Sequence, residues 1–131
     1  MSGTPGSYRV RGVGAMGNTF LVITGTTFDT SILAWRINEQ GNVLGSTAIS
    51  TGSVDAVACA PDRCAVVWEH GSSSSTRVTR IALDGTNLDP FGIIVAPNAN
   101  YAGGVAFNGV HFLVGISGGV RRVGLDGSVI G

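Results

Sequence analysis

The segment RINEQGNVL, residues 36–44, occurs in three related copies and decides the fold. It returns as RIALDGTNL at residues 80–88 and as RVGLDGSVI at residues 122–130. The shared pattern is Arg, a β-branched residue, three variable positions, Gly, two variable positions, and then Leu or Ile. Successive copies begin 44 and 42 residues apart (36 to 80, and 80 to 122). A period of this length indicates a repeat architecture.

A second shared phrase precedes each copy. Residues 13–24, 57–68 and 105–116 align as a short apolar run, a turn, and a more continuously apolar run. The turn pairs Gly17-Asn18, Pro61-Asp62 and Asn108-Gly109 are types that favour a β-hairpin. Helical periodicity is absent from the sequence, so the pattern predicts an all-β protein.

Each repeat is therefore expected to hold an inner hairpin, a variable loop, a third strand that ends near a Gly turn, and a short fourth strand. The third strands are predicted at residues 32–37, 77–83 and 120–125, and the fourth at 46–50 and 93–96. The third repeat reaches residue 131 before a fourth strand would come. We expect a single repeat segment, divided approximately into residues 8–50, 51–97 and 98–131.

Four antiparallel strands with a period of about 40 to 50 residues form the blade of a β-propeller. The pattern resembles the propeller-like repeats of large bacterial surface or secreted proteins. In that family the inner hairpin reads like Val-Ala-Phe-Asn-Gly-x-x-Phe-Leu-Val, and an Arg-containing strand leads to Asp-Gly-x-x-Leu. Residues 105–114 and 84–88 match these two forms. The resemblance implies three four-stranded propeller blades, the last of them incomplete.

Three blades do not close a ring, since propellers typically have four to eight. We expect the chain to be completed by its own copies, with a homodimer giving a six-bladed ring as the favoured partner. A piece of a longer propeller is the second alternative, and an open sheet that is not a propeller is the third.

Charge and hydropathy exclude some partners. The chain has 131 residues, eight basic and eight acidic side chains, and a formal net charge of zero, and every basic residue is Arg. A nucleic-acid partner is not expected, because such proteins carry a basic excess or patch. No apolar run is long enough to span a membrane and no signal peptide is visible, so membrane insertion is not expected either.

Cys59 and Cys64 flank the turn of the second hairpin, where the third repeat carries Phe107 and Phe112. Residues directly opposed across a hairpin can lie at disulfide distance. A disulfide would favour an extracellular, cell-surface or periplasmic location, whereas two buried free thiols are the alternative. Two Cys without further Cys or His at ligand spacing do not predict a metal site, and we expect no cofactor.

Arg36, Arg80 and Arg122 occupy one equivalent position. They could line a repeated anion site, or each could hold a neighbouring loop through carbonyls or a carboxylate, which suits a guanidinium group. Because the residue repeats in every copy, the sequence favours the structural role.

The resemblance also implies a binding face, because in propellers the loops after the second and fourth strands share one face. On this chain these loops are residues 28–29, 51–55, 69–75, 98–101 and 117–119. Aromatic, acidic and amide side chains on them are the candidate ligand contacts: Phe28, Asp29, Asp55, Glu69, His70, Asn98, Asn100 and Tyr101. The aromatic residues of the strand phrases are instead expected in the core: Phe20, Trp68, Phe107 and Phe112.

Two functions remain open after these observations. The first is a non-catalytic scaffold or protein-interaction module, and the alternative is a lectin-like, carbohydrate-binding propeller. A lectin would repeat its contact residues in each blade, but the loop residues differ between the copies. An enzyme is not expected, because Glu69 and His70 are neighbours on a strand and point to opposite faces, and no nucleophile motif accompanies them.

Overall fold

A computed structural model describes residues 8–26, 31–71, 74–97 and 102–131. These residues form ten β-strands and no helix, which confirms the predicted all-β class. In chain order the strands are β1 (Tyr8–Met16), β2 (Thr19–Thr26), β3 (Ser31–Ile37), β4 (Val43–Cys59), β5 (Arg63–His70), β6 (Thr76–Ala82), β7 (Ile93–Ala96), β8 (Ala102–Phe107), β9 (His111–Ile116) and β10 (Gly119–Gly124). With no helix in these ranges, none of them contains a helical membrane span.

All strand pairs are antiparallel, and the strands form two sheets. Strands β1 to β7 follow one another in a curled seven-stranded sheet, and β8, β9 and β10 form a second sheet with β9 in the middle. The long strand β4 belongs to both halves of the first sheet, since it pairs with β3 up to Thr51 and with β5 from Gly52 onward.

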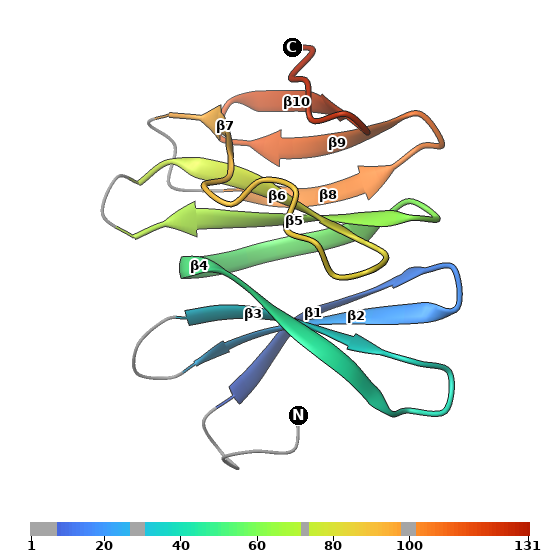
Figure 1. The fold of residues 1–131 in the computed structure, drawn as a ribbon. Helices are drawn as coiled ribbons and strands as arrows, with labels where there is room; N and C mark the ends of the chain where they lie inside the picture. Colours follow the sequence, from blue (N-terminus) through green and yellow to red (C-terminus); the bar gives the residue numbers. More distant parts are fainter. Residues whose placement is uncertain (1–7, 27–30, 72–73, 98–101) are drawn as a thin grey trace.

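The change of partner within β4 divides the molecule into three layers (Figure 1). Layer one contains β1, β2, β3 and residues 43–51 of β4. Layer two contains residues 52–59 of β4 together with β5, β6 and β7. Layer three contains β8, β9 and β10. Figure 1 shows the C-terminus above the third layer.

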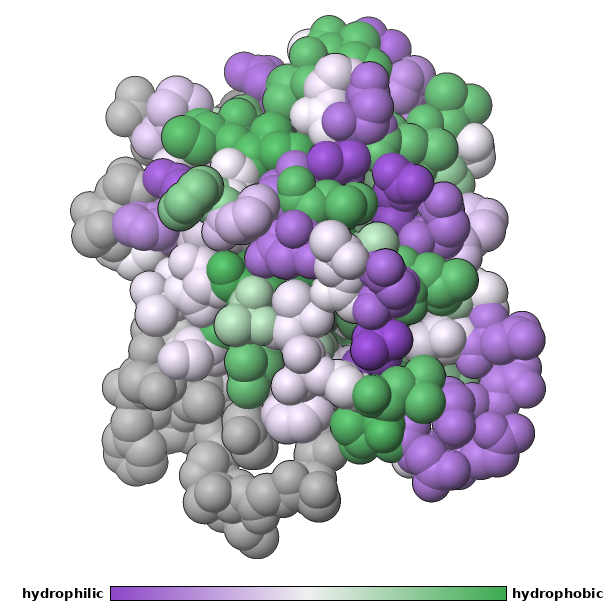
Figure 2. All heavy atoms as spheres, viewed as in Figure 1, coloured by the Kyte–Doolittle hydropathy of each residue, from purple (hydrophilic) through white to green (hydrophobic). Residues whose placement is uncertain are grey.

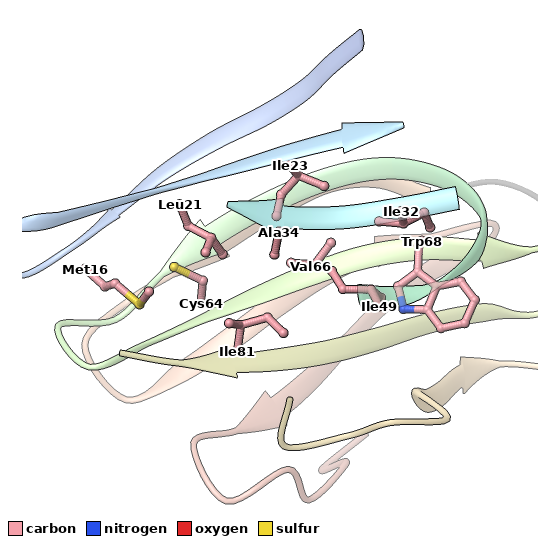
Figure 3. Packing of buried hydrophobic residues seen from close by; sticks show 10 residues of the cluster. All are labelled: Met16, Leu21, Ile23, Ile32, Ala34, Ile49, Cys64, Val66, Trp68 and Ile81. Carbon is pink, nitrogen blue, oxygen red and sulfur yellow. The ribbon is translucent and has the colours of Figure 1, made fainter. Parts of the chain in front are cut away.

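One hydrophobic cluster joins layers one and two. Leu21 and Ile23 of β2 face Cys64, Val66 and Trp68 of β5, and all are nearly inaccessible to solvent. Figure 3 shows these side chains pointing toward one another between β2 and β3 on one side and β5 and β6 on the other. Alternation along β5 explains why one strand serves two clusters, because successive side chains point to opposite faces.

A second cluster joins layers two and three. Ala65 and Val67 of β5 contact Phe112 and Val114 of β9, and Val78 of β6 adds to the same cluster. Layer two is therefore buried on both faces, while layers one and three are each buried on one. The core consists of two parallel interfaces rather than one central mass.

Two details differ from the predictions. Residues 51–55 were expected as a loop, but they continue strand β4. Thr, Gly and Ser are common in turns, yet Gly52 has a φ of 150° and lies directly against the Glu69 carbonyl, where a side chain would not fit. Glycine thus lets the strand pass from one layer to the next without a turn.

The second correction concerns Phe20, which was expected in the core. Its exposed fraction is 43%, whereas Phe112 at the equivalent position is fully buried. Phe20 lies on the outer face of layer one, over which the described residues place no further layer of strands. Val22 and Thr24 on the same face of β2 are nevertheless buried. Trp68 is fully buried as predicted, and Phe107 is partly buried against the second cluster.

Candidate functional site

Three of the eight predicted ligand contacts lie in the part of the chain that the structure describes. Asp55 and Glu69 lie together where β4 passes beside the end of β5. His70 is the next residue on β5, and its ring lies near that of Trp68 instead. The other five, Phe28, Asp29, Asn98, Asn100 and Tyr101, lie outside the described residues.

Asp55 occupies a bulge in β4, because the pairing with β5 shifts register between Val54 and Ala56. Burial raises the pKa of Asp55 to about 7, and the nearby charge of Glu69 and a hydrogen bond with its side chain add to the effect. One buried oxygen of each carboxyl group, Asp55 Oδ2 and Glu69 Oε1, has no hydrogen-bond partner among the described residues. Asp55 therefore keeps its proton to a higher pH than an exposed Asp side chain does.

His70 closes the loop that follows β5. Its backbone N–H donates to the Ser75 carbonyl over 2.9 Å, and its carbonyl accepts from the Ser74 N–H over 3.1 Å. Its ring centre lies 6.1 Å from that of Trp68. Among the described residues, no group of three or more His, Cys, Asp or Glu side chains is placed to hold a metal ion.

The predicted disulfide is present. Cys59 and Cys64 are register partners across the turn between β4 and β5, and their Cα atoms are 3.9 Å apart. The equivalent residues of layer three, Phe107 and Phe112, form an aromatic pair with ring centres 5.0 Å apart. A disulfide therefore replaces an aromatic contact at one position of the repeat, and it is compatible with an oxidising extracellular or periplasmic location.

Arg80 links layer two to layer three. Its Nη1 donates to the Leu125 carbonyl over 2.7 Å, and Arg63 Nη1 donates to the same oxygen over 2.8 Å. The guanidinium group also forms two contacts with the Asp89 carboxylate, Nε–Oδ2 at 2.8 Å and Nη2–Oδ1 at 2.9 Å. These are contacts with a carbonyl and a carboxylate, the kind expected of a structural Arg.

Asp89 was not singled out by the sequence. Its aligned positions in the other two copies are Gly45 and Gly131, so the repeat gives no signal for it. The one cue in the sequence is that an acidic residue, Asp89, directly follows the second copy of the repeated phrase.

The two outer faces of the stack carry apolar side chains. On layer one, Val13 and Phe20 are 57% and 43% exposed, and on layer three Leu113 and Val120 are 45% and 52% exposed. In Figure 2 hydrophobic side chains gather on the surface near the top of the molecule, around the β10 end of the stack. These two faces are the candidate interaction surfaces, because large apolar patches on soluble proteins often serve that purpose.

Comparison of the sequence with models of protein families finds no matching family, and comparison with curated proteins finds no matching relative. The function must therefore be argued from the layers, the end faces and the contacts between them.

Proposed function

We propose that the chain is a three-blade segment of a β-propeller and serves as a non-catalytic scaffold that assembles through its two end faces. Each layer is one blade in this proposal. The first strands of the three layers are β1, residues 52–59 of β4, and β8, and the contacts between them support it. Gly12 and Gly14 of β1 lie against Val57 and Cys59 of β4, and β4 in turn contacts β8. Strands that surround a central axis would neighbour one another in this way.

The observation that carries the proposal concerns equivalent positions of the repeat. Positions that are exposed on the two outer faces are buried between layers in the other copies. Phe20 on layer one aligns with Cys64 and Phe112, which are both fully buried against the preceding layer. Val120 on layer three aligns with Val78 and Ala34, which are buried against the following layer. The outer face of layer one is thus built to receive a preceding layer, and that of layer three to receive a following one.

A second copy of the chain offers both of the surfaces that are needed. Its layer three can cover layer one, and its layer one can cover layer three. Two copies related by a two-fold axis would form both junctions at once and close a ring of six blades, which is within the usual range for propellers. The disulfide supports a location outside the cytoplasm for this assembly.

The sugar-binding alternative has no comparable support. Asp55, Glu69 and His70 align with Arg11, Gly25 and Thr26 in the first repeat, so these side chains do not recur there. A lectin with one site in each blade would be expected to repeat them.

The test is the mass of the native particle, measured by light scattering after size exclusion. The chain mass is 13.3 kDa, and the proposal predicts a particle of twice this mass. A particle that remains at the mass of one chain at high concentration would overturn assembly through the end faces. Particles that grow without limit on concentration would support head-to-tail contacts but contradict a closed ring.

A further inference from the structure

The Gly turn of the repeated phrase has the same backbone structure in all three layers. In layer one the Asn38 N–H donates to the Asn42 carbonyl and the Gly41 N–H to the Asn38 carbonyl, both over 3.0 Å. Layer two repeats these bonds between Ala82, Thr86 and Gly85, and layer three between Gly124, Ser128 and Gly127. The three glycines have φ values of 88°, 93° and 88°. The turn is therefore one preformed unit that occurs three times.

In layers two and three this turn lies against an Arg of the preceding layer. A Cβ added to Gly85 would lie 2.7 Å from Arg36 Nε, and one added to Gly127 would lie 2.9 Å from Arg80 Cζ. An acidic residue precedes each of these two glycines, and its pKa is lowered. Hydrogen bonds from Thr86 lower the pKa of Asp84, with a further contribution from Arg36, and bonds from Ser128 lower that of Asp126, with a further contribution from Arg80.

Strand register explains why these Arg side chains reach the next layer. Arg36 pairs with Leu21 and Arg80 with Ala65, and both partners are buried against the following layer. Arg122 pairs with Leu113, which lies on the uncovered face of layer three. Arg122 is itself exposed, and its guanidinium group makes no hydrogen bond or ion pair that involves the described residues.

The opposite end of the molecule lacks the matching Arg. Gly41 is exposed, and a Cβ added to it would have no atom within 4 Å. Layer one thus presents the turn without its Arg, and layer three presents the Arg without its turn.

We propose that Arg122 of one copy docks on the turn at Gly41 of a second copy, and so sets the register of each junction in the assembly. This inference rests on the proposed function, because it specifies how the end faces meet. The guanidinium group would contact the backbone of the turn, as Arg80 contacts the Leu125 carbonyl at 2.7 Å within the chain. Two differences set this junction apart. Gln40 occupies the position of Asp84 and Asp126, and Gly131 occupies the position of Asp89, which binds Arg80.

The first test removes the Arg side chain. Arg122→Ala should weaken each junction about tenfold, because a hydrogen bond to a charged group is lost. The dimer dissociation constant should therefore rise about a hundredfold, since each substitution occurs at both junctions. The measurement is fluorescence-detected sedimentation across a dilution series. Arg121→Ala is the matched control, because Arg121 pairs with Val114 of the inner face, and it should leave the constant within about threefold.

The second test adds the missing charge. Gln40→Asp places a carboxylate where Asp84 and Asp126 lie in the inner junctions, within the electrostatic influence of an Arg. It should tighten each junction by about twofold to fivefold. The gain should vanish in the Gln40→Asp, Arg122→Ala double variant. Dimers that respond to neither substitution would overturn this inference and leave the proposed assembly standing. Monomers in the wild type and in Gln40→Asp would overturn both.

Discussion

Arg80 and Asp89 form a two-point ion pair inside layer two, with Nε–Oδ2 at 2.8 Å and Nη2–Oδ1 at 2.9 Å. Their side chains are only 11% and 12% exposed. Arg80 uses its remaining Nη1 on the Leu125 carbonyl of layer three. Asp89 therefore fixes one of the two Arg side chains, Arg80 and Arg63, that donate to the edge of the next layer.

Removal of the carboxylate should destabilise the chain strongly. Asp89→Ala leaves Arg80 as a buried cation without its counter-charge, and breaking a buried pair in this way costs about 3 kcal/mol or more. The free energy of unfolding, measured in urea, should fall by that amount.

The control is the exposed ion pair of Arg63 with Asp62, where the Asp62 side chain is 57% exposed. Asp62→Ala should change the free energy of unfolding by less than about 1 kcal/mol. Equal losses in the two variants would contradict the role assigned to Asp89.

The disulfide should contribute to stability although its loop is short. Cys59 and Cys64 are five residues apart, and the chain-entropy relation for a loop of this size gives about 2 kcal/mol. Unfolding in urea with and without a thiol reductant measures the difference. The Cys59→Ala, Cys64→Ala double variant should be insensitive to the reductant, and a wild type that is equally insensitive would show that the bond contributes nothing.

The sequence predicted the strands better than it predicted the connections between them. Periodic apolar runs and Gly turns located β3, β6, β7 and β10 within about one residue, because these signals are local. The course of β4 through Gly52 could not be predicted in the same way, because it depends on the contact with Glu69 in another strand.

The candidate site was predictable only in part, for a related reason. The disulfide followed from hairpin register. Of the three repeated Arg residues, Arg80 makes carbonyl and carboxylate contacts, whereas Arg36 Nε is buried without a hydrogen-bond partner among the described residues. Three features were not predictable: the ion pair of Asp89, the bulge at Asp55 and the exposure of Phe20. Each depends on which residues lie nearby in the folded chain. Asp89 is not repeated, and Phe20 differs from Phe112 in its position in the stack rather than in its own strand.

Phe20 and Phe112 provide a direct test of the end face. Phe112→Ala should lower the free energy of unfolding by about 3 to 5 kcal/mol, because the side chain is fully buried between two layers. Phe20→Ala removes the same atoms from a surface that is 43% exposed, so the loss in the dissociated chain should be below about 1 kcal/mol.

The same Phe20→Ala variant should weaken self-association, because Phe20 would be covered in the assembly. Sedimentation equilibrium measures this effect separately from unfolding. An unchanged association constant would argue that the outer face of layer one is not the contact surface.

Stability should also depend on pH through Asp55. Its pKa is about 7 in the folded chain, raised mainly by burial, against 3.8 for an unperturbed Asp. The folded state therefore holds a proton that the unfolded state releases, so the stabilisation is fully present below about pH 4. It is lost progressively as the pH rises to about 7. Unfolding in urea at a series of pH values should show this decline.

Two variants separate the causes of the decline. Asp55→Asn has no proton to lose at this position, so the decline between pH 4 and pH 7 should be absent or much reduced. Glu69→Gln removes the neighbouring charge but leaves the burial, which is the larger cause, so the decline should persist over a narrower pH range. If the wild type and Asp55→Asn show the same pH dependence, Asp55 does not hold the proton, and another titrating group must account for any decline.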